Sequence, residues 1–236
     1  MAIAVGATSK GRSASTTSQA TTGVTTQASG SAFVVAFIWD TGNFSSIADS
    51  KSNTYTQIGT EQVNSDSAKI RAYYVENGTG GSSHTATVNL SVASPITVLF
   101  AEITGGLTSG ILDQSDIRWD TASPYTLAAG LTTTQAAELL LSFLGGNSGS
   151  NPATHAESGL GSSTIQIEET NGASFYTAAI ATSIKSSTGT FNPSWTETGS
   201  TKGGVMLATL KEAAGGGFDL RFNLCVLNSV KRAANF

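Results

Sequence analysis

Few residues of this sequence have the types and spacing that catalysis requires. Gly146-Asn147-Ser148-Gly149-Ser150 comes nearest to the Gly-x-Ser-x-Gly turn that presents a nucleophilic serine, but its spacing differs. Gly159-Leu160-Gly161 lacks the third glycine of a dinucleotide-binding turn, so we interpret it as a linker. No acid–base pair or nucleophile–base set can be assembled from the chain. We therefore expect no catalytic residue and no enzymatic activity.

Metal-ligating residues are also sparse. The two histidines, His84 and His155, lie far apart in the sequence. His155-Ala156-Glu157 could offer two ligands, but we interpret this stretch as a solvated loop. Three aspartates share one predicted loop: Asp113, Asp116 and Asp120. The loop lacks the glycine and the glutamate that complete an EF-hand calcium site, so we expect neither a metal nor a cofactor.

Aromatic residues next to polar ones form a candidate sugar-binding set. Trp119, Asp120, Tyr125 and Trp195 are expected in loops or at strand ends. There a flat ring can stack on a sugar while a carboxylate binds its hydroxyls. The alternative is that these rings close the ends of a sandwich or form a subunit contact.

The elements that must position these residues are predicted to be strands. Ser31–Asp40 is a nearly unbroken apolar run, typical of a strand buried on both faces. A tight corner follows, where Asp49 and Ser50 can cap their own backbone and Asn53 tolerates a left-handed conformation. His84–Val92 alternates between apolar and polar residues, and Pro95 is expected to separate it from a second strand at residues 96–103.

Strands with intervening turns continue to residue 211. They are expected at Ala68–Glu76, Glu138–Leu144, Thr164–Thr170, Ser174–Ile184 and Gly203–Lys211. Residues 110–126 and 145–163 are predicted to be irregular. This pattern, without a convincing amphipathic helix, predicts an all-β chain that forms an antiparallel β-sandwich or jelly roll. No repeat of fixed period stands out, which argues against a propeller or solenoid.

Three parts are expected along the chain. Residues 1–30 form a loose Ser/Thr-rich arm or edge strands, residues 31–213 form the sandwich, and residues 214–236 form a glycine hinge with a C-terminal anchoring segment. In that last segment one face of an alternating strand carries the candidate partner contacts: Phe218, Leu220, Phe222, Leu224 and Val226. This strand either folds back on its own sandwich or extends the sheet of a neighbouring subunit.

Composition limits the partners. Charged residues make up 12% of the 236 residues and the net charge is −4, which argues against nucleic acid because phosphate binding needs a basic patch. A single cysteine, Cys225, excludes an intramolecular disulfide. We identify neither a secretory signal nor a stretch of transmembrane length. A chain made in a host cytoplasm and released as part of a virus particle satisfies these constraints.

Several stretches resemble a β-sandwich module of bacteriophage virion proteins, which also has relatives in bacterial surface proteins. They are Trp39-Asp40, Asp49-Ser50, Asn53-Thr54-Tyr55-Thr56, Tyr73-Tyr74-Val75, His84–Val92 and Phe100-Ala101-Glu102-Ile103. The resemblance spans roughly residues 20–212 and departs where Lys51-Ser52 replaces the glycine common after Asp-Ser. It brings no catalytic residues.

The resemblance implies a structural role. We expect a decoration (cement) protein of the phage head, located in the virion, that forms a homotrimer and contacts the major capsid protein or other virion proteins. The alternative is a lectin-like carbohydrate- or receptor-binding module of a tail fibre or a bacterial surface protein. Neither nucleic acid nor a membrane is an expected partner.

Overall fold

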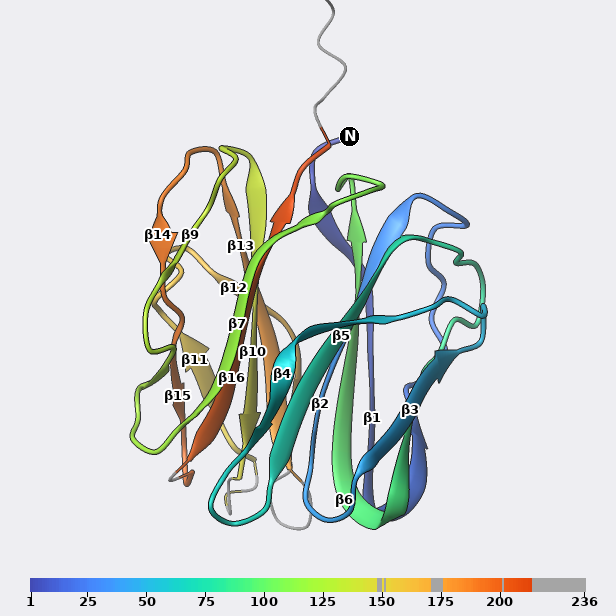
Figure 1. Cartoon of the computed structure of the whole chain (residues 1–236), viewed down its shortest axis with the longest axis vertical. Coiled ribbons are helices and arrows are strands. Elements are labelled where there is room, and N and C mark those ends of the chain that lie inside the picture. The colour runs from blue at the N-terminus through green and yellow to red at the C-terminus, as the bar shows by residue number, and fades with distance from the viewer. Residues whose placement is uncertain (148–149, 151, 171–175, 201, 214–236) are drawn as a thin grey trace, which may run out of the picture.

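The computed structural model consists of strands arranged in two face-to-face sheets, each covered by an outer layer (Figure 1). It describes residues 1–147, 150, 152–170, 176–200 and 202–213. All strand pairings within this part are antiparallel. The expected all-β antiparallel sandwich is thus confirmed, while jelly-roll connectivity stays a prediction. No helix in the described residues is long and apolar enough to cross a membrane.

Sixteen strands are defined. In chain order they are β1 (Ala4–Ala20), β2 (Ser31–Trp39), β3 (Phe44–Asp49), β4 (Thr56–Val63), β5 (Lys69–Gly78), β6 (Ala86–Thr104), β7 (Leu112–Asp120), β8 (Tyr125–Thr126), β9 (Leu131–Thr132), β10 (Glu138–Gly146), β11 (His155–Glu157), β12 (Thr164–Glu169), β13 (Thr177–Lys185), β14 (Thr190–Phe191), β15 (Ser194–Glu197) and β16 (Gly203–Lys211). The first sheet has the order β1-β6-β2-β5-β4, and β3 also pairs with β6. The second sheet has the order β12-β13-β10-β16-β7.

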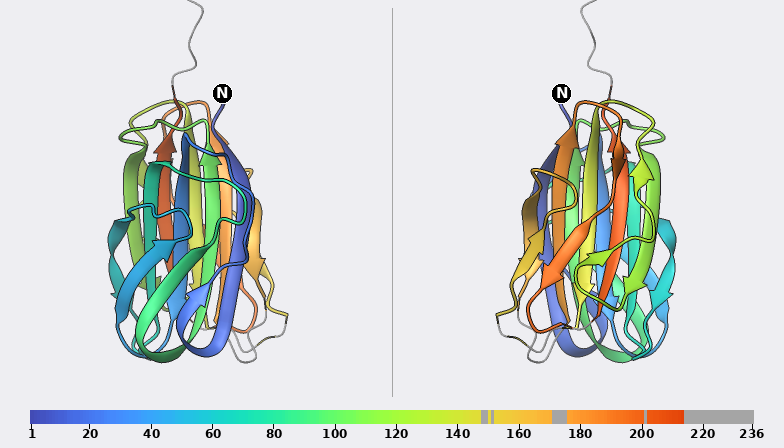
Figure 2. Two further views of the ribbon diagram at one scale, coloured as in Figure 1. Left: turned by 90° about the vertical axis from the view of Figure 1, so that its right-hand side faces the viewer. Right: turned by 90° about the vertical axis from the view of Figure 1, so that its left-hand side faces the viewer.

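Each sheet has an outer layer. On the second sheet it is the small sheet β11-β15-β8. On the first sheet it is made by β3 and by the parts of β6 and β1 that pair near it, Ala86–Leu90 and Ser18–Ala20. The two side views in Figure 2 show one outer layer each.

Strand β6 passes from the outer layer into the main sheet without a break. The sequence predicted two strands separated by Pro95, and this prediction is wrong. Proline is tolerated here because the β1–β6 pairing is irregular between Ser13 and Thr16, opposite this part of β6. A bulge of this kind removes the need for the ladder hydrogen bond that proline cannot donate.

The four layers enclose three apolar clusters. The central cluster lies between the two main sheets and draws on both halves of the chain, for example Val34, Leu99, Leu141 and Met206. One outer cluster lies beneath β3 and contains Phe33, Phe37, Trp39 and Val88 among others. The other lies beneath β11-β15-β8. Strand β2 contributes to two clusters, which confirms the prediction that it is buried on both faces.

The two halves of the chain repeat one topology. The second sheet, read in the order β7-β16-β10-β13-β12, repeats the order β1-β6-β2-β5-β4 of the first sheet. Each strand of one list is equivalent to the strand at the same place in the other. Equivalent strands lie about 108 residues apart, since β4 begins at Thr56 and β12 at Thr164. The outer strands correspond as well, with β3 matching β11. The sequence did not reveal this repeat.

Local hydrogen bonding is repeated along with the topology. The Thr26 hydroxyl accepts from the Gly81 amide at 3.0 Å, and the Thr133 hydroxyl accepts from the Gly189 amide at 3.1 Å. The corner after each outer strand is also shared: the Ser50 amide donates to the Thr85 carbonyl at 3.0 Å, and the Ser158 amide to the Ser194 carbonyl at 3.1 Å. These matches show that the two halves correspond residue by residue.

Several other expectations changed. The N-terminal residues form the edge strand β1, one of the two alternatives. Residues 110–126 and 145–163, predicted to be irregular, contain β7 and β11. At the corner after β3 it is Ser52, with φ 61°, and not Asn53, that takes the left-handed conformation. The hinge and strand expected at residues 214–236 lie outside the described residues.

Candidate functional site

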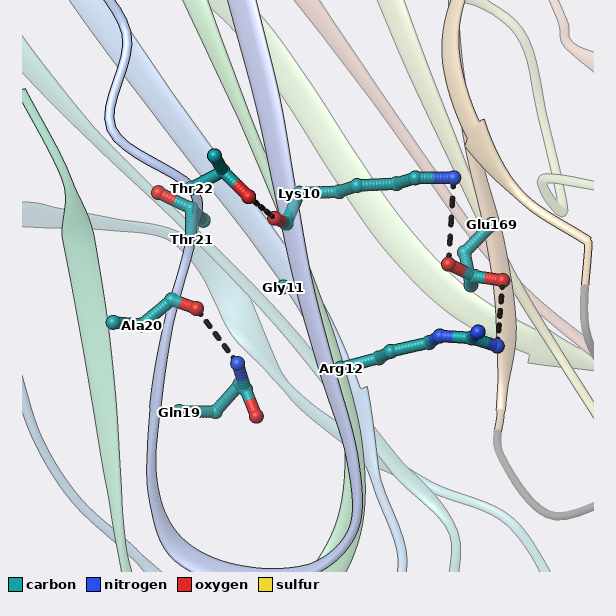
Figure 3. A pocket seen from close by; sticks show the side chains of 8 residues that line it. All are labelled: Lys10, Gly11, Arg12, Gln19, Ala20, Thr21, Thr22 and Glu169. Carbon is teal, nitrogen blue, oxygen red and sulfur yellow. Dashed lines mark hydrogen bonds and ion pairs between the residues drawn. The ribbon is translucent and has the colours of Figure 1, made fainter.

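Charged side chains gather where the edge strands of the two main sheets meet, at β1 and β12. There Lys10 and Arg12 lie on β1 and both reach Glu169 on β12, at 3.3 Å and 3.1 Å (Figure 3). Lys10 Nζ also donates to the Glu168 carbonyl at 2.7 Å. Glu169 is only 5% exposed, so these cations replace the water that would otherwise solvate its carboxylate. We call this contact the ionic seam.

A polar groove of about 380 Å³ opens beside the ionic seam. The groove lies between residues 10–12 of β1 and residues 19–22, where the chain has folded back alongside them. The Thr22 amide and hydroxyl both donate to the Lys10 carbonyl. Gly11 allows this close approach, because a β-carbon there would collide with the carbonyl oxygen of Ala20. Gln19 closes the lower part by donating to the same carbonyl, at 2.6 Å (Figure 3).

The opposite seam of the sandwich, between β4 and β7, is closed differently. In the second repeat, Ile117 stands at the position of Lys10, and Trp119 at the position of Arg12. This follows from the registers in which β1 pairs with β6 and β7 pairs with β16. Ile117 packs onto Gly59, whose φ of 62° suits glycine. Trp119 donates its indole N–H to the Gln62 carbonyl at 3.0 Å. One seam of the repeated fold is therefore largely apolar and the other ionic.

A second ionic cluster lies on the outer side of β12. The side chain of His155 is fully buried on β11, with Nδ1 2.8 Å from Glu168 Oε2 and Nε2 3.1 Å from Glu197 Oε1. The Thr177 hydroxyl also donates to Glu197 Oε1. We call these residues the His155 cluster. The sequence placed His155 in a solvated loop, and this is wrong, because β15 and β12 enclose its ring.

The His155 cluster favours a charged imidazole. Burial by itself lowers the pKa of His155, but hydrogen bonds to Glu197 and Glu168 and the negative charges of both carboxylates outweigh it. The pKa of His155 therefore lies above its ordinary value. A protonated ring can donate from both nitrogens, which is what two flanking carboxylates require.

The other histidine stabilises a corner. His84 Nε2 lies 2.9 Å from Asp49 Oδ2, and Nδ1 lies 3.0 Å from the Thr26 hydroxyl. Asp49 also accepts from the amides of Lys51 and Asn53, at 2.9 Å and 3.0 Å. Burial opposes ionisation of Asp49, but hydrogen bonds from Asn53, His84 and Lys51 outweigh it, so its pKa is lowered. The predicted capping by Asp49 is confirmed.

The candidate sugar-binding residues do not form one exposed set. Tyr125 and Trp195 are fully buried, with the Trp195 indole N–H donated to Ser142 Oγ at 2.8 Å. Neither ring has a face on which a sugar could stack, which corrects the expectation. Trp119 is partly buried in the seam described above, and Asp120 accepts from the Thr121 and Thr126 amides. The contacts expected at Phe218, Leu220, Phe222, Leu224 and Val226 lie outside the described residues.

The aspartates considered for calcium have protein partners. Asp113 accepts from the Thr134 amide at 2.8 Å and lies 3.6 Å from Lys211 Nζ. Asp116 accepts from the Ile117 amide at 2.8 Å. Over the described ranges, no three His, Cys, Asp or Glu side chains converge so that they could hold a metal ion.

Sequence reasoning missed the ionic seam and the His155 cluster. Lys10 and Glu169 are separated by more than 150 residues, and no local motif connects them.

Comparison with known proteins adds no relative: no protein-family description, curated protein or solved structure matches this chain.

Proposed function

We propose that this protein is a structural component of a bacteriophage particle, a decoration (cement) protein that stabilises the head through contacts between subunits. The proposal rests on the resemblance to virion β-sandwich modules and on the Ser/Thr-rich composition, in which only 12% of the residues are charged. In this role the sandwich serves as a rigid block, and a terminal segment binds the block to its neighbours. The proposed assembly is a homotrimer on the major capsid protein.

One observation carries the proposal: both ends of the described chain leave the sandwich at the same place (Figure 1). The Ala213 amide donates to the Gly105 carbonyl at 2.9 Å. Gly105, with φ 70°, also lies against the carbonyl of Ala2, where a β-carbon would collide. Residues 214–236, with their glycine run and alternating apolar residues, continue from this end. In the proposed role, the contacts of residues 214–236 with neighbours would start from this end of the block.

Deletion of residues 215–236 tests the proposal. We expect the shortened chain to unfold at nearly the same temperature as the full chain, because the described sandwich ends at Ala213. We expect it to bind poorly to capsids that lack the protein, measured by co-sedimentation with particles of the encoding phage. A full-length variant with Phe218→Ser and Phe222→Ser is the matched control for chain length, and it should bind as poorly as the deletion. Unchanged capsid binding by either variant would refute the anchoring role.

A lectin-like module is the second function that the sequence suggested. Of its three candidate rings, Tyr125 and Trp195 are enclosed, and Trp119 is held by its hydrogen bond to Gln62. No observation on the described residues favours this alternative.

A further inference from the structure

The repeat makes it possible to compare the His155 cluster with the same positions in the first half. The cross-strand pair His155–Glu197 of β11 and β15 corresponds to the pair Ile47–Val88 of β3 and β6. Val88 is fully buried, and Ile47 packs against the same apolar cluster. An ionisable pair in one half thus occupies the place of an aliphatic pair in the other.

Space for the ionisable pair comes from a third exchange. Gly146 stands in the second half where Trp39 stands in the first. Its cross-strand partners, Thr177 and Gly203, are equivalent to the partners of Trp39, which are Lys69 and Ile96. Trp39 is a large buried ring of the first outer cluster. Gly146 instead leaves room for the Glu197 carboxylate, which a β-carbon at this position would overlap. Three linked positions therefore differ between the halves in a way that builds one buried polar site.

A buried ion cluster is a costly replacement for aliphatic packing. Removing charges from water costs several kcal/mol per ion, and well-packed apolar residues often serve stability equally well or better. Glu197 Oε2 is buried and has no hydrogen-bond partner among the described residues, so the cluster is not optimised for stability alone. What it adds, and what Ile47 and Val88 cannot provide, is a response to protonation.

The cluster also joins separate layers. His155 and Glu197 belong to the outer sheet, Glu168 to β12 and Thr177 to β13 of the main sheet below. The chain offers few other charges here. Glu157, the other acid of β11, accepts from the amides of Gly159, Leu160 and Ser194. Glu169 faces Lys10 and Arg12, and the flanking stretches 147–154 and 170–176 contain Tyr176 as their one titratable residue.

We propose that the His155 cluster is a protonation-dependent latch, which holds the outer sheet β11-β15-β8 against β12 and β13 while His155 is charged and releases it as the pH rises. A neutral imidazole has a single N–H, so it can donate to Glu168 or to Glu197 but not to both. Loss of the proton leaves two carboxylates close together, one of them buried, with no cation between them. Opening of the sheet that carries Glu197 then becomes more favourable, because water can solvate the Glu197 carboxylate. This inference is independent of the proposed structural role.

The direction of the pH dependence follows from linkage. The folded pKa of His155 is raised above the 6.5 of a free histidine. Its stabilising contribution is therefore fully present below about pH 6.5 and is lost as the pH rises through the raised value. Between these two pH values the equilibrium constant for opening increases about tenfold for each pH unit.

Amide hydrogen exchange of the full chain between pH 6 and 9, corrected for intrinsic rates, tests the latch. We expect protection of the amides of β11 and β15 to fall about tenfold per pH unit between pH 6.5 and the raised pKa of His155, and then to level off, while β10 and β16 beneath them keep their protection. Protection of β11 and β15 that is independent of pH would overturn the latch. So would a loss that is equally large in β10 and β16, because that would be global unfolding.

Two variants make the test specific. H155I/E197V installs the aliphatic pair of the first half and should abolish the pH dependence of β11 and β15. E168Q removes one of the two carboxylates, so a single partner raises the pKa of His155 less. The loss of protection should then be smaller in total and should end at a lower pH than in the wild type. If H155I/E197V retains the full pH dependence, another group is responsible and the proposal is wrong. If the double variant does not fold, E168Q and the wild-type exchange profile decide, and an unshifted E168Q profile refutes the latch.

Discussion

Buried carboxylates in this protein fix the backbone at particular residues. Asp49 and Glu157 end equivalent outer strands, and each accepts from the amide two residues further along the chain, at 2.9 Å and 2.7 Å. Glu102 performs a related task, accepting from the amides of Ala7 and Gln27 and from the Ser31 hydroxyl. An amide left unpaired in these places would cost about 1–3 kcal/mol, which explains why acidic residues are tolerated in a largely uncharged chain.

Asp49→Ala should be among the most damaging single substitutions. It removes the acceptor for His84, Tyr55 and the Lys51 and Asn53 amides, so we expect a loss of about 3 kcal/mol or more in the free energy of unfolding. The pKa of Asp49 lies below its ordinary value of about 3.8, so its contribution is present above that pH and lost as the pH falls through the lowered pKa. Urea unfolding at pH 7 and pH 3 measures both effects. Asp66→Ala, on an exposed side chain, is the control and should change little.

Trp195→Ala tests whether Trp195 is a core residue or a ligand-binding residue. Because the ring is fully buried, we expect a loss of about 3–5 kcal/mol in unfolding free energy. Trp195→Phe keeps most of the packing but loses the 2.8 Å hydrogen bond to Ser142, and should cost about 1–3 kcal/mol. Wild-type stability in Trp195→Ala, measured by urea unfolding, would contradict the burial and reopen the question of an exposed aromatic site.

Among the elements, the apolar strands were the most predictable. β2 and β16 appear in the sequence as apolar runs because both faces of each strand are buried, so their prediction depended on composition alone. β7 and β11 were missed because nearly all of their residues are only partly buried and their polar positions make cross-strand contacts. Their assignment depends on partners more than 30 residues away, which a local pattern does not encode.

The same limitation applied to the sites. The aromatic candidates were chosen by residue type, and their burial depended on an outer sheet that the sequence did not predict. Lys10, Arg12 and Glu169 had no distinguishing local feature at all. They could have been found only from the knowledge that β1 and β12 are the neighbouring edges of two facing sheets.

The ionic seam makes a testable contribution at the level of these two strands. Arg12→Met keeps the aliphatic stem but deprives the nearly buried Glu169 of one cation, so we expect a loss of about 1–3 kcal/mol in unfolding free energy. Arg118→Met on β7 is the matched control. Arg118 is as exposed as Arg12, but its partner Asp120 is less buried than Glu169 and lies farther away, at 3.7 Å, so this substitution should cost less than about 1 kcal/mol. Equal effects of the two substitutions in chemical denaturation would argue against a special role for the seam.

At the scale of the whole molecule, the protein is two repeats that share a core. Val34 and Leu99 from the first repeat face Leu141 and Met206 from the second in the central cluster. Each repeat has its own outer cluster, but neither can bury the inner face of its main sheet without the other. The two repeats should therefore unfold together, and the differences between them, in the ionic seam and the His155 cluster, are specialisations of one common plan.

Separate expression of the two repeats tests this account most directly. Division of the chain between Ser109 and Gly110, in the exposed connection before β7, gives fragments 1–109 and 110–236. We predict that the two fragments, refolded together, form a one-to-one complex with the circular dichroism spectrum and cooperative unfolding of the intact chain. Each fragment alone should not be a stably folded monomer, because the inner face of its sheet would be exposed. A fragment that folds cooperatively as a monomer, or a pair that does not associate, would contradict the shared core.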